Sequence, residues 1–132
     1  MGWAIEKSAG VRDTAGFEVY KETPTVTADG SGSTFSLPVD KDNCYIMIKA
    51  TLAGTTPSFD CNLEVSPDGT NWVTHTDVIG TAITATATKL KKISLSSDGK
   101  APYYRLTWDI DIANSDETYA VDCYYWYPKR GK

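Results

Sequence analysis

The sequence has little of what enzymes and metal sites need. Its 132 residues include one histidine, His75, so a Ser-His-Asp arrangement or a multi-histidine metal site would have to be built around that side chain. His75 stands in a threonine-rich segment, where a polar surface residue is the simpler interpretation. There is also no glycine-rich phosphate loop and no paired-cysteine zinc spacing. We therefore expect no enzyme activity, no cofactor and no metal.

Positive charge and long hydrophobic runs are also scarce. The 17 acidic and 13 basic side chains give a net charge of −4, which repels phosphate backbones. No stretch approaches the roughly 18 consecutive apolar residues of a membrane-spanning helix. Residues 1–6 lack the basic and apolar regions of a secretory signal. These observations predict no nucleic-acid partner, no membrane and synthesis in the cytoplasm.

The composition fits one globular domain. A chain of 132 residues, 41% of them hydrophobic, buries enough surface to fold without metal or disulfide support. The cysteines Cys44, Cys61 and Cys123 are odd in number and stand in strand-like runs. We interpret them as small buried hydrophobic side chains rather than as a disulfide framework.

Apolar and polar residues alternate along much of the chain, which predicts β-strands. The alternation is clearest in residues 103–112, where Tyr104, Leu106 and Trp108 share one face. The predicted strands cover residues 17–23, 35–39, 45–52, 59–65, a strand and long loop within 72–88, 93–95, 103–112 and 119–127. Pro38 makes the second of these an edge strand.

About eight strands and no convincing helix favour an all-β fold, an antiparallel two-sheet β-sandwich that is jelly-roll-like. Another Greek-key sandwich stays open, because one sequence does not reveal strand order. The predicted organisation is an extended N-terminal arm at 1–16, with Trp3 and Ile5 as anchors, a β-sandwich domain at 17–128 and a basic C-terminal tail at 129–132.

The segment between residues 66 and 72 has the chemistry of a tight turn. Pro67 fixes φ, Asp68 can bond the backbone two residues on, and Gly69 supplies a positive φ. Trp72 then restarts the strand with a large apolar side chain. We predict a hairpin turn here, with a ligand-binding loop as the alternative.

Carboxylates gather near the end of another hairpin, at Asp109, Asp111, Asp116 and Glu117. Clustered oxygens suit calcium, but the residues lack the order of a known calcium loop. We interpret them as a solvated rim that opposes aggregation.

Tyr124 and Trp126 alternate with Val121 and Cys123 and therefore share the opposite face of the last strand. Aromatic residues on both faces of a strand indicate that both faces are covered or that one awaits a partner. Three explanations compete: burial beneath the N-terminal arm, a subunit or capsid interface, and a platform for stacking sugars.

The strand and turn that end in Ser66-Pro67-Asp68-Gly69-Thr70-Asn71-Trp72 are similar to a turn in small β-sandwich virion proteins of tailed bacteriophages, and also in discoidin-like carbohydrate-binding domains. This turn, the predicted all-β fold, the N-terminal arm and the charged tail together resemble those of a phage capsid cement or decoration protein. Discoidin-like domains differ, since they are usually secreted, longer and closed by a disulfide.

The resemblance to cement proteins implies a structural virion protein with no catalytic residue, made in the host cytoplasm and placed on the capsid exterior. It implies a homo-oligomer, with a trimer favoured, that bridges neighbouring subunits of the major capsid protein. The expected partner-binding residues are Trp3, Ile5, Tyr124, Trp126 and Arg130. The alternative is a carbohydrate-binding or tail-associated adhesion module, with Trp126, Tyr124 and Tyr103 stacking on sugar rings. A tail fibre or head-completion component is a third possibility.

Overall fold

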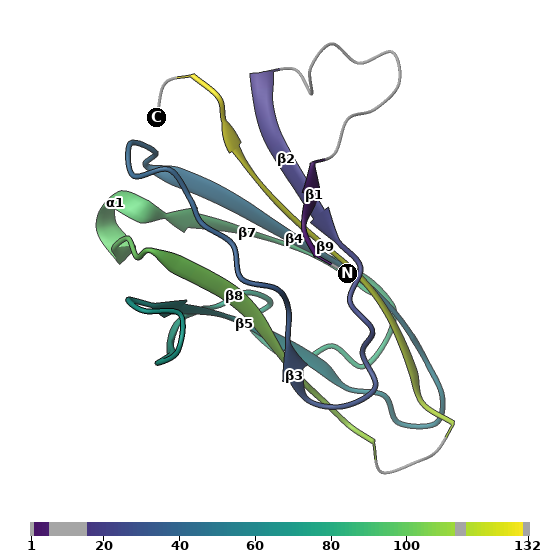
Figure 1. The fold of residues 1–132 in the computed structure, drawn as a ribbon. Coiled ribbons are helices and arrows are strands. Elements are labelled where there is room, and N and C mark those ends of the chain that lie inside the picture. Colours follow the sequence, from purple (N-terminus) through teal and green to yellow (C-terminus); the bar gives the residue numbers. More distant parts are fainter. Residues whose placement is uncertain (1, 6–15, 113–115, 131–132) are drawn as a thin grey trace.

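Two antiparallel β-sheets lie face to face in the computed structural model, which describes residues 2–5, 16–112 and 116–130 (Figure 1). The described elements are β1 (Ala4–Ile5), β2 (Phe17–Glu22), β3 (Gly30–Ser31), β4 (Asn43–Ala53), β5 (Phe59–Ser66), β6 (Val73–Asp77), β7 (Ala87–Ser94), the short helix α1 (Leu95–Asp98), β8 (Tyr103–Ile110) and β9 (Thr118–Pro128).

The strand order is that of a jelly roll. One sheet runs β1-β2-β9-β4-β7 and the other β3-β8-β5-β6. With β1 set aside, the first of the remaining eight strands pairs with the last, the second with the seventh, the third with the sixth and the fourth with the fifth. This nested pairing confirms the predicted all-β, jelly-roll-like sandwich and settles the order that the sequence left open.

The core lies between the sheets because the long strands alternate as predicted. In β4 every second residue from Cys44 to Leu52 is buried, and in β9 the same holds from Val121 to Tyr127. The two strands pair along nine positions, so these side chains form one continuous surface. The large side chains that are fully buried are Phe59, Leu63, Tyr104, Leu106, Ile46, Ile48, Ile93 and Leu95.

Three of the predicted strands differ from those in the structure. Residues 35–39 form no strand: Phe35 makes one isolated bridge to Tyr104, and Val39 is 81% exposed. The pairing does not extend beyond Phe35, and Pro38 has no N–H with which to continue it. The strand expected at 93–95 is the end of β7, which begins at Ala87, and Leu95 starts α1. The strand expected to reach residue 112 ends at Ile110.

The 66–72 turn joins β5 to β6, which pair antiparallel. The Ser66 hydroxyl accepts the N–H groups of Asp68 and Gly69 at 3.2 and 2.8 Å. Asp68 Oδ1 accepts those of Thr70 and Asn71 at 2.9 and 2.8 Å. Gly69 has φ +78°, which disfavours any side chain there. These bonds fix the direction in which the chain enters β6.

The described part of the N-terminal arm adds a strand to the sheet edge. Ala4 and Ile5 pair with Lys21 and Tyr20 of β2. Trp3 turns toward the core, where its ring centroid lies 4.8 Å from that of Tyr125 and 5.3 Å from that of Phe35. Its Nε1 donates to the Ser33 carbonyl at 2.9 Å. Trp3 therefore closes the side of the sandwich where β2 and β3 diverge.

Replacement of Asp68 tests the turn. Its hydrogen-bond donors hold the pKa of the Asp68 carboxyl far below the ordinary value of about 3.9. A lowered pKa stabilises the fold above the unfolded-state pKa, and that stability is lost as the carboxylate protonates. We expect Asp68→Asn to be less stable than the wild type at pH 7, with the difference shrinking below about pH 4. Urea unfolding at several pH values, followed by circular dichroism, measures this. A constant difference across pH would contradict it, and Asp40→Asn is the control.

Removal of the Trp3 ring tests the closing role of β1. We expect Trp3→Ala to lower the free energy of unfolding by about 2 kcal/mol, because a packed ring and its hydrogen bond are lost. Ile5, two residues after Trp3 in β1, is 49% exposed. Ile5→Ala should therefore change the free energy by less than about 0.5 kcal/mol. Equal effects of the two variants in denaturant titrations would show that the ring has no special place.

Candidate interaction surface

The outward side of the five-stranded sheet carries a band of large side chains from four strands. Trp126 of β9 lies in register between Val19 of β2 and Tyr45 of β4. One step along, Tyr124 lies between Lys21 and Met47, and Met47 pairs in turn with Leu90 of β7. We call this set the outer aromatic face: Val19, Lys21, Tyr45, Met47, Leu90, Tyr124 and Trp126.

Neighbouring side chains of the outer aromatic face contact one another. Tyr45 and Trp126 are stacked, with centroids 5.6 Å apart and planes at 14°. The Lys21 ammonium lies 5.5 Å from the centre of the Tyr124 ring, within the range of a cation–π contact. Both pairs leave the rings half-buried. The face is thus ordered before any partner arrives.

The β7 strand forms the rim of this face. Leu90 projects outward and is 63% exposed. Lys92 shares its side, whereas Lys89 and Lys91 pair with Ile48 and Ile46 and so project toward the inner side of the sandwich. Lysines on a free edge oppose pairing with another strand. The rim therefore favours contacts through the face rather than along the edge.

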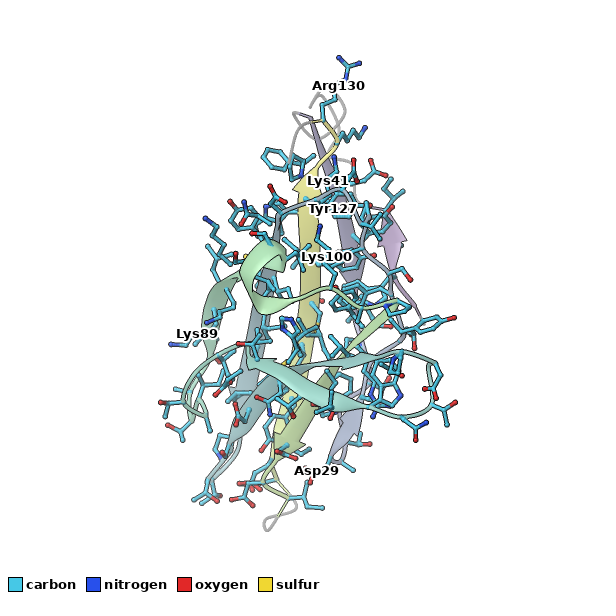
Figure 2. All side chains as sticks on the ribbon, turned by 90° about the vertical axis from the view of Figure 1, so that its left-hand side faces the viewer. Asp29, Lys41, Lys89, Lys100, Tyr127 and Arg130 are labelled. Carbon is cyan, nitrogen blue, oxygen red and sulfur yellow. The ribbon has the colours of Figure 1, made fainter. Side chains whose placement is uncertain are left out.

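The structure brings together only two of the predicted partner-binding residues. Tyr124 and Trp126 lie on the outer aromatic face, whereas Trp3 and Ile5 share a side with Tyr20 on the inward face of the same sheet. Arg130 is exposed at one end of the sandwich, opposite the end that carries Asp29 (Figure 2). The five residues thus belong to three separate places.

The described part of the arm does not cover the outer aromatic face. Trp3 packs on Tyr125 and Phe35, on the opposite side of the sheet from Tyr124 and Trp126. Burial beneath the arm is therefore not achieved by residues 2–5. The rest of the arm, residues 6–15, lies outside the described residues.

Sequence reasoning missed Tyr45, Met47 and Leu90. The alternation at 45–52 already put Met47 on the polar side of that strand, and Tyr45 follows by the same period. Leu90 was hidden because lysines surround it in an edge strand. What the sequence could not provide was the register that puts these three beside Trp126 and Tyr124.

The outward side of the other sheet is polar. Arg105 donates from Nε and Nη2 to the Glu64 carboxylate, each at 2.8 Å, and its guanidinium lies 4.3 Å from the Trp72 ring. Tyr103 belongs to this sheet, on β8. Tyr103 therefore lies apart from Tyr124 and Trp126, the other two residues expected to stack on sugar rings, because two different sheets carry them.

The acidic residues expected to form a rim bond to a neighbouring loop. Asp116 accepts from the Thr55 hydroxyl at 2.6 Å, and Glu117 from the backbone and hydroxyl of Thr56 at 3.0 and 2.9 Å. Across the described residues, no three His, Cys, Asp or Glu side chains are grouped so that they could hold a metal ion. The only histidine, His75, places Nε2 3.2 Å from the Gly99 carbonyl.

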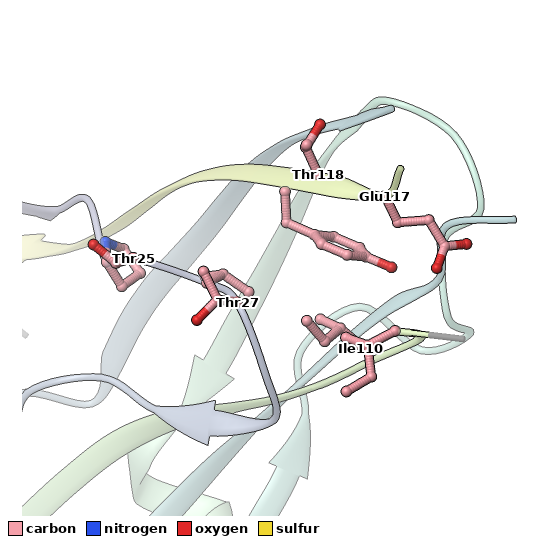
Figure 3. Close-up of a pocket in the computed structure, with 9 residues that line it drawn as sticks. Thr25, Thr27, Ile110, Glu117 and Thr118 are labelled. Atoms are coloured by element: carbon pink, nitrogen blue, oxygen red, sulfur yellow. The ribbon is translucent and has the colours of Figure 1, made fainter. Parts of the chain in front are cut away.

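A cavity of about 290 Å³ lies between the β2–β3 connection, the last residue of β8 with Ile112 beyond it, and the first residues of β9. Figure 3 shows Thr25, Thr27, Ile110, Glu117 and Thr118 around it. Its lining mixes threonine hydroxyls with isoleucine side chains, and the Tyr119 hydroxyl is already engaged by the Asp111 carbonyl at 2.7 Å. The cavity shows no converging set of catalytic groups.

No protein-family model matches the sequence, and no curated protein matches it. In the part of the chain that the structure describes, no helix has the length and apolar character to cross a membrane. Among solved structures, the chain is similar to the SPBc2 prophage-derived protein YomS, with 8% identity and a TM-score of 0.43 over 83% of this chain and 92% of that one.

Two further structures are similar at the same level. One is the arabinosyltransferase EmbB of Mycobacterium smegmatis, with 15% identity and a TM-score of 0.41 over 91% of this chain and 13% of that one. The other is the infectious bursal disease virus Gx strain, with 12% identity and a TM-score of 0.41 over 85% and 32%. None of the three is close enough to bear on the function of this chain.

Thiol reactivity tests how well the core is sealed. Burial raises the pKa of the Cys44 thiol to about 12 and raises those of Cys61 and Cys123 above their ordinary value. Because the thiolate is the nucleophile, we expect a dithiobis-nitrobenzoate reagent at pH 8 to label the folded protein much more slowly than the protein in concentrated guanidinium chloride. In the denaturant all three thiols should react. Fast labelling of one thiol in the folded protein would show an opening to the core.

Proposed function

We propose that this protein is a structural virion protein, of the capsid cement or decoration type, and that it attaches through the outer aromatic face to the major capsid protein. The observation that carries the proposal is the preformed band of apolar and aromatic side chains on an outward sheet surface. Soluble monomers rarely expose such patches unless a partner covers them.

The chemistry of the face suits a protein partner. Tyrosine, tryptophan and methionine are enriched at the centres of protein interfaces, and here they form the middle of the patch. Leu90 and the lysines Lys21 and Lys92 stand toward its margin. A partner surface that fits would have an apolar centre and acidic residues around it.

Repetition would give such a contact its strength. A symmetric oligomer, with a trimer favoured, presents the same face several times to a repeating lattice. Once one copy has bound, the others bind at a high effective concentration, so modest single contacts add up to durable attachment. Bridging between capsid subunits then resists the pressure of packaged DNA.

A second candidate, a carbohydrate-binding or tail-associated adhesion module, is favoured by one observation. Tyr45 and Trp126 are stacked, with their planes 14° apart, and the pair presents aromatic surface on the outward side of the sheet. Such a surface can stack on the apolar face of a sugar. In this case Trp126 and Tyr124 would contact the glycan, with Tyr45 in place of Tyr103.

Leu90→Glu tests the capsid proposal. Because Leu90 is 63% exposed, its replacement should leave the fold intact while it places a charge on the proposed interface. We expect binding to empty capsids, built from the major capsid protein of the same genome, to weaken by about tenfold or more in a co-sedimentation titration.

The chain offers a matched control for that variant. Val73 lies on β6 of the other sheet and is 62% exposed, so Val73→Glu adds the same charge at equal exposure but away from the face. It should bind capsids as the wild type does. If the unmodified protein does not bind capsids and a glycan array gives binding that Trp126→Ala removes, the adhesion module replaces the capsid proposal.

A further inference from the structure

Glu22, the last residue of β2, is a buried carboxylate with few partners. Its side chain faces the space between the sheets and only 3% of it is exposed. Both carboxylate oxygens share one donor, the Ser33 N–H, at 3.1 and 3.3 Å. Among the described residues, no lysine, arginine or histidine forms an ion pair with it.

A cavity of about 330 Å³ lies beside this carboxylate. Its wall includes the Trp108 ring and the hydroxyl-bearing residues Thr25, Ser31 and Ser33. Gly32 completes it: a Cβ at that position would lie 2.6 Å from Glu22 Oε1. The missing side chain thus lets the carboxylate approach the backbone that surrounds the cavity.

In the part of the chain that the structure describes, the site has a carboxylate but few hydrogen-bond donors and no positive charge to pair with it. A carboxylate has about four positions for accepting hydrogen bonds, and one N–H fills few of them. Removing a charge from water without a counter-charge is costly, so buried charges are normally paired. The cavity beside the charge is lined by Thr25, Ser31, Ser33 and Trp108, none of which carries a charge. An incoming cation would find both a counter-charge and hydrogen-bond acceptors.

We propose that the Glu22 cavity binds an organic cation, a single ammonium or guanidinium group on a short stem, as found at the end of a lysine or arginine side chain. Such a group donates several hydrogen bonds to a carboxylate and supplies the counter-charge for it. A cavity of this size holds a group of this kind with accompanying water. The inference does not depend on the proposed function.

A neutral sugar suits the cavity less well. Stacking on a sugar needs an exposed ring face, and Trp108 is a buried residue of β8. The Glu22 charge would also remain unpaired against neutral hydroxyl groups. Methyl glucoside is therefore a suitable negative probe.

The test is a titration of the full chain with methylguanidinium and with methylammonium, followed by nitrogen–proton correlation spectra at constant ionic strength. We expect saturable shifts of the Trp108 indole N–H and of the Gly32 and Ser33 amides. Methyl glucoside and added sodium chloride should leave these signals in place. Signals that drift in proportion to concentration, without saturation, would overturn the proposal.

Two charge-removing variants locate the site. Glu22→Gln keeps the shape of the side chain and should weaken binding by about tenfold or more, the usual effect of losing a charge-assisted hydrogen bond. Glu18→Gln removes a carboxylate from the same strand, where Glu18 pairs with Lys129 at 3.6 Å, and should bind as the wild type does. Equal binding by both variants would place the cation elsewhere.

A third variant keeps the test decisive if Glu22→Gln fails to fold. Thr25 is exposed and lines the cavity, so Thr25→Lys places a tethered ammonium at its mouth. We expect this variant to melt at a higher temperature and to lose its response to free methylammonium. An unchanged titration would count against the site.

The same spectra separate a free amine from a protein side chain as the source of the cation. N-acetyl-lysine methylamide and N-acetyl-arginine methylamide carry the cation on a full side chain with flanking amides. Saturable shifts with these two compounds show that a partner protein can insert such a side chain. Shifts with the small cations alone restrict the ligand to free amines.

Discussion

The contact between Phe35 and Tyr125, whose ring centroids are 4.2 Å apart, is the interaction on which much of the structure depends. Phe35 is bridged to Tyr104 of one sheet, and Tyr125 belongs to the central strand of the other. Because successive side chains of a strand alternate, an inward Tyr125 sends Tyr124 and Trp126 outward. A slip of one residue in β9 would bury the two outward rings and expose the core tyrosines. The same contact also provides the surface on which Trp3 rests.

Period-two patterns predicted most of the fold because they depend only on one buried face per strand. β4, β8 and β9 alternate along their length and β5 does so as far as Glu64, and each was found within two residues of its expected bounds. β7 was largely missed, since Lys89 and Lys91 occupy positions where a central strand would have apolar residues. An edge strand tolerates them because its inward side is only partly covered. Pairing order was beyond reach, because it depends on contacts between residues far apart in the chain.

In the candidate surfaces, too, local patterns in the sequence predicted some residues, and contacts between distant segments determined the others. Tyr124 and Trp126 were found from the sequence, because aromatic residues on the polar side of a strand conflict with the pattern around them. Tyr45 and Leu90 join them only through the register of three strands. Glu22 gave no signal at all: it ends a strand with mixed side chains, and its burial arises from Ser33 and Trp108, which lie on other segments. Such a site forms only when distant segments come together in the fold, so no local sequence motif predicts it.

The lysines of β7 have a consequence for crowded conditions. A sheet with a bare outermost strand can add further strands from neighbouring molecules, and this growth leads to insoluble cross-β fibrils. Lys89 and Lys91 bring positive charges to that margin, so two copies that approach side by side repel each other there. Association through this edge is therefore disfavoured, while the outward side of the sheet stays available for contacts.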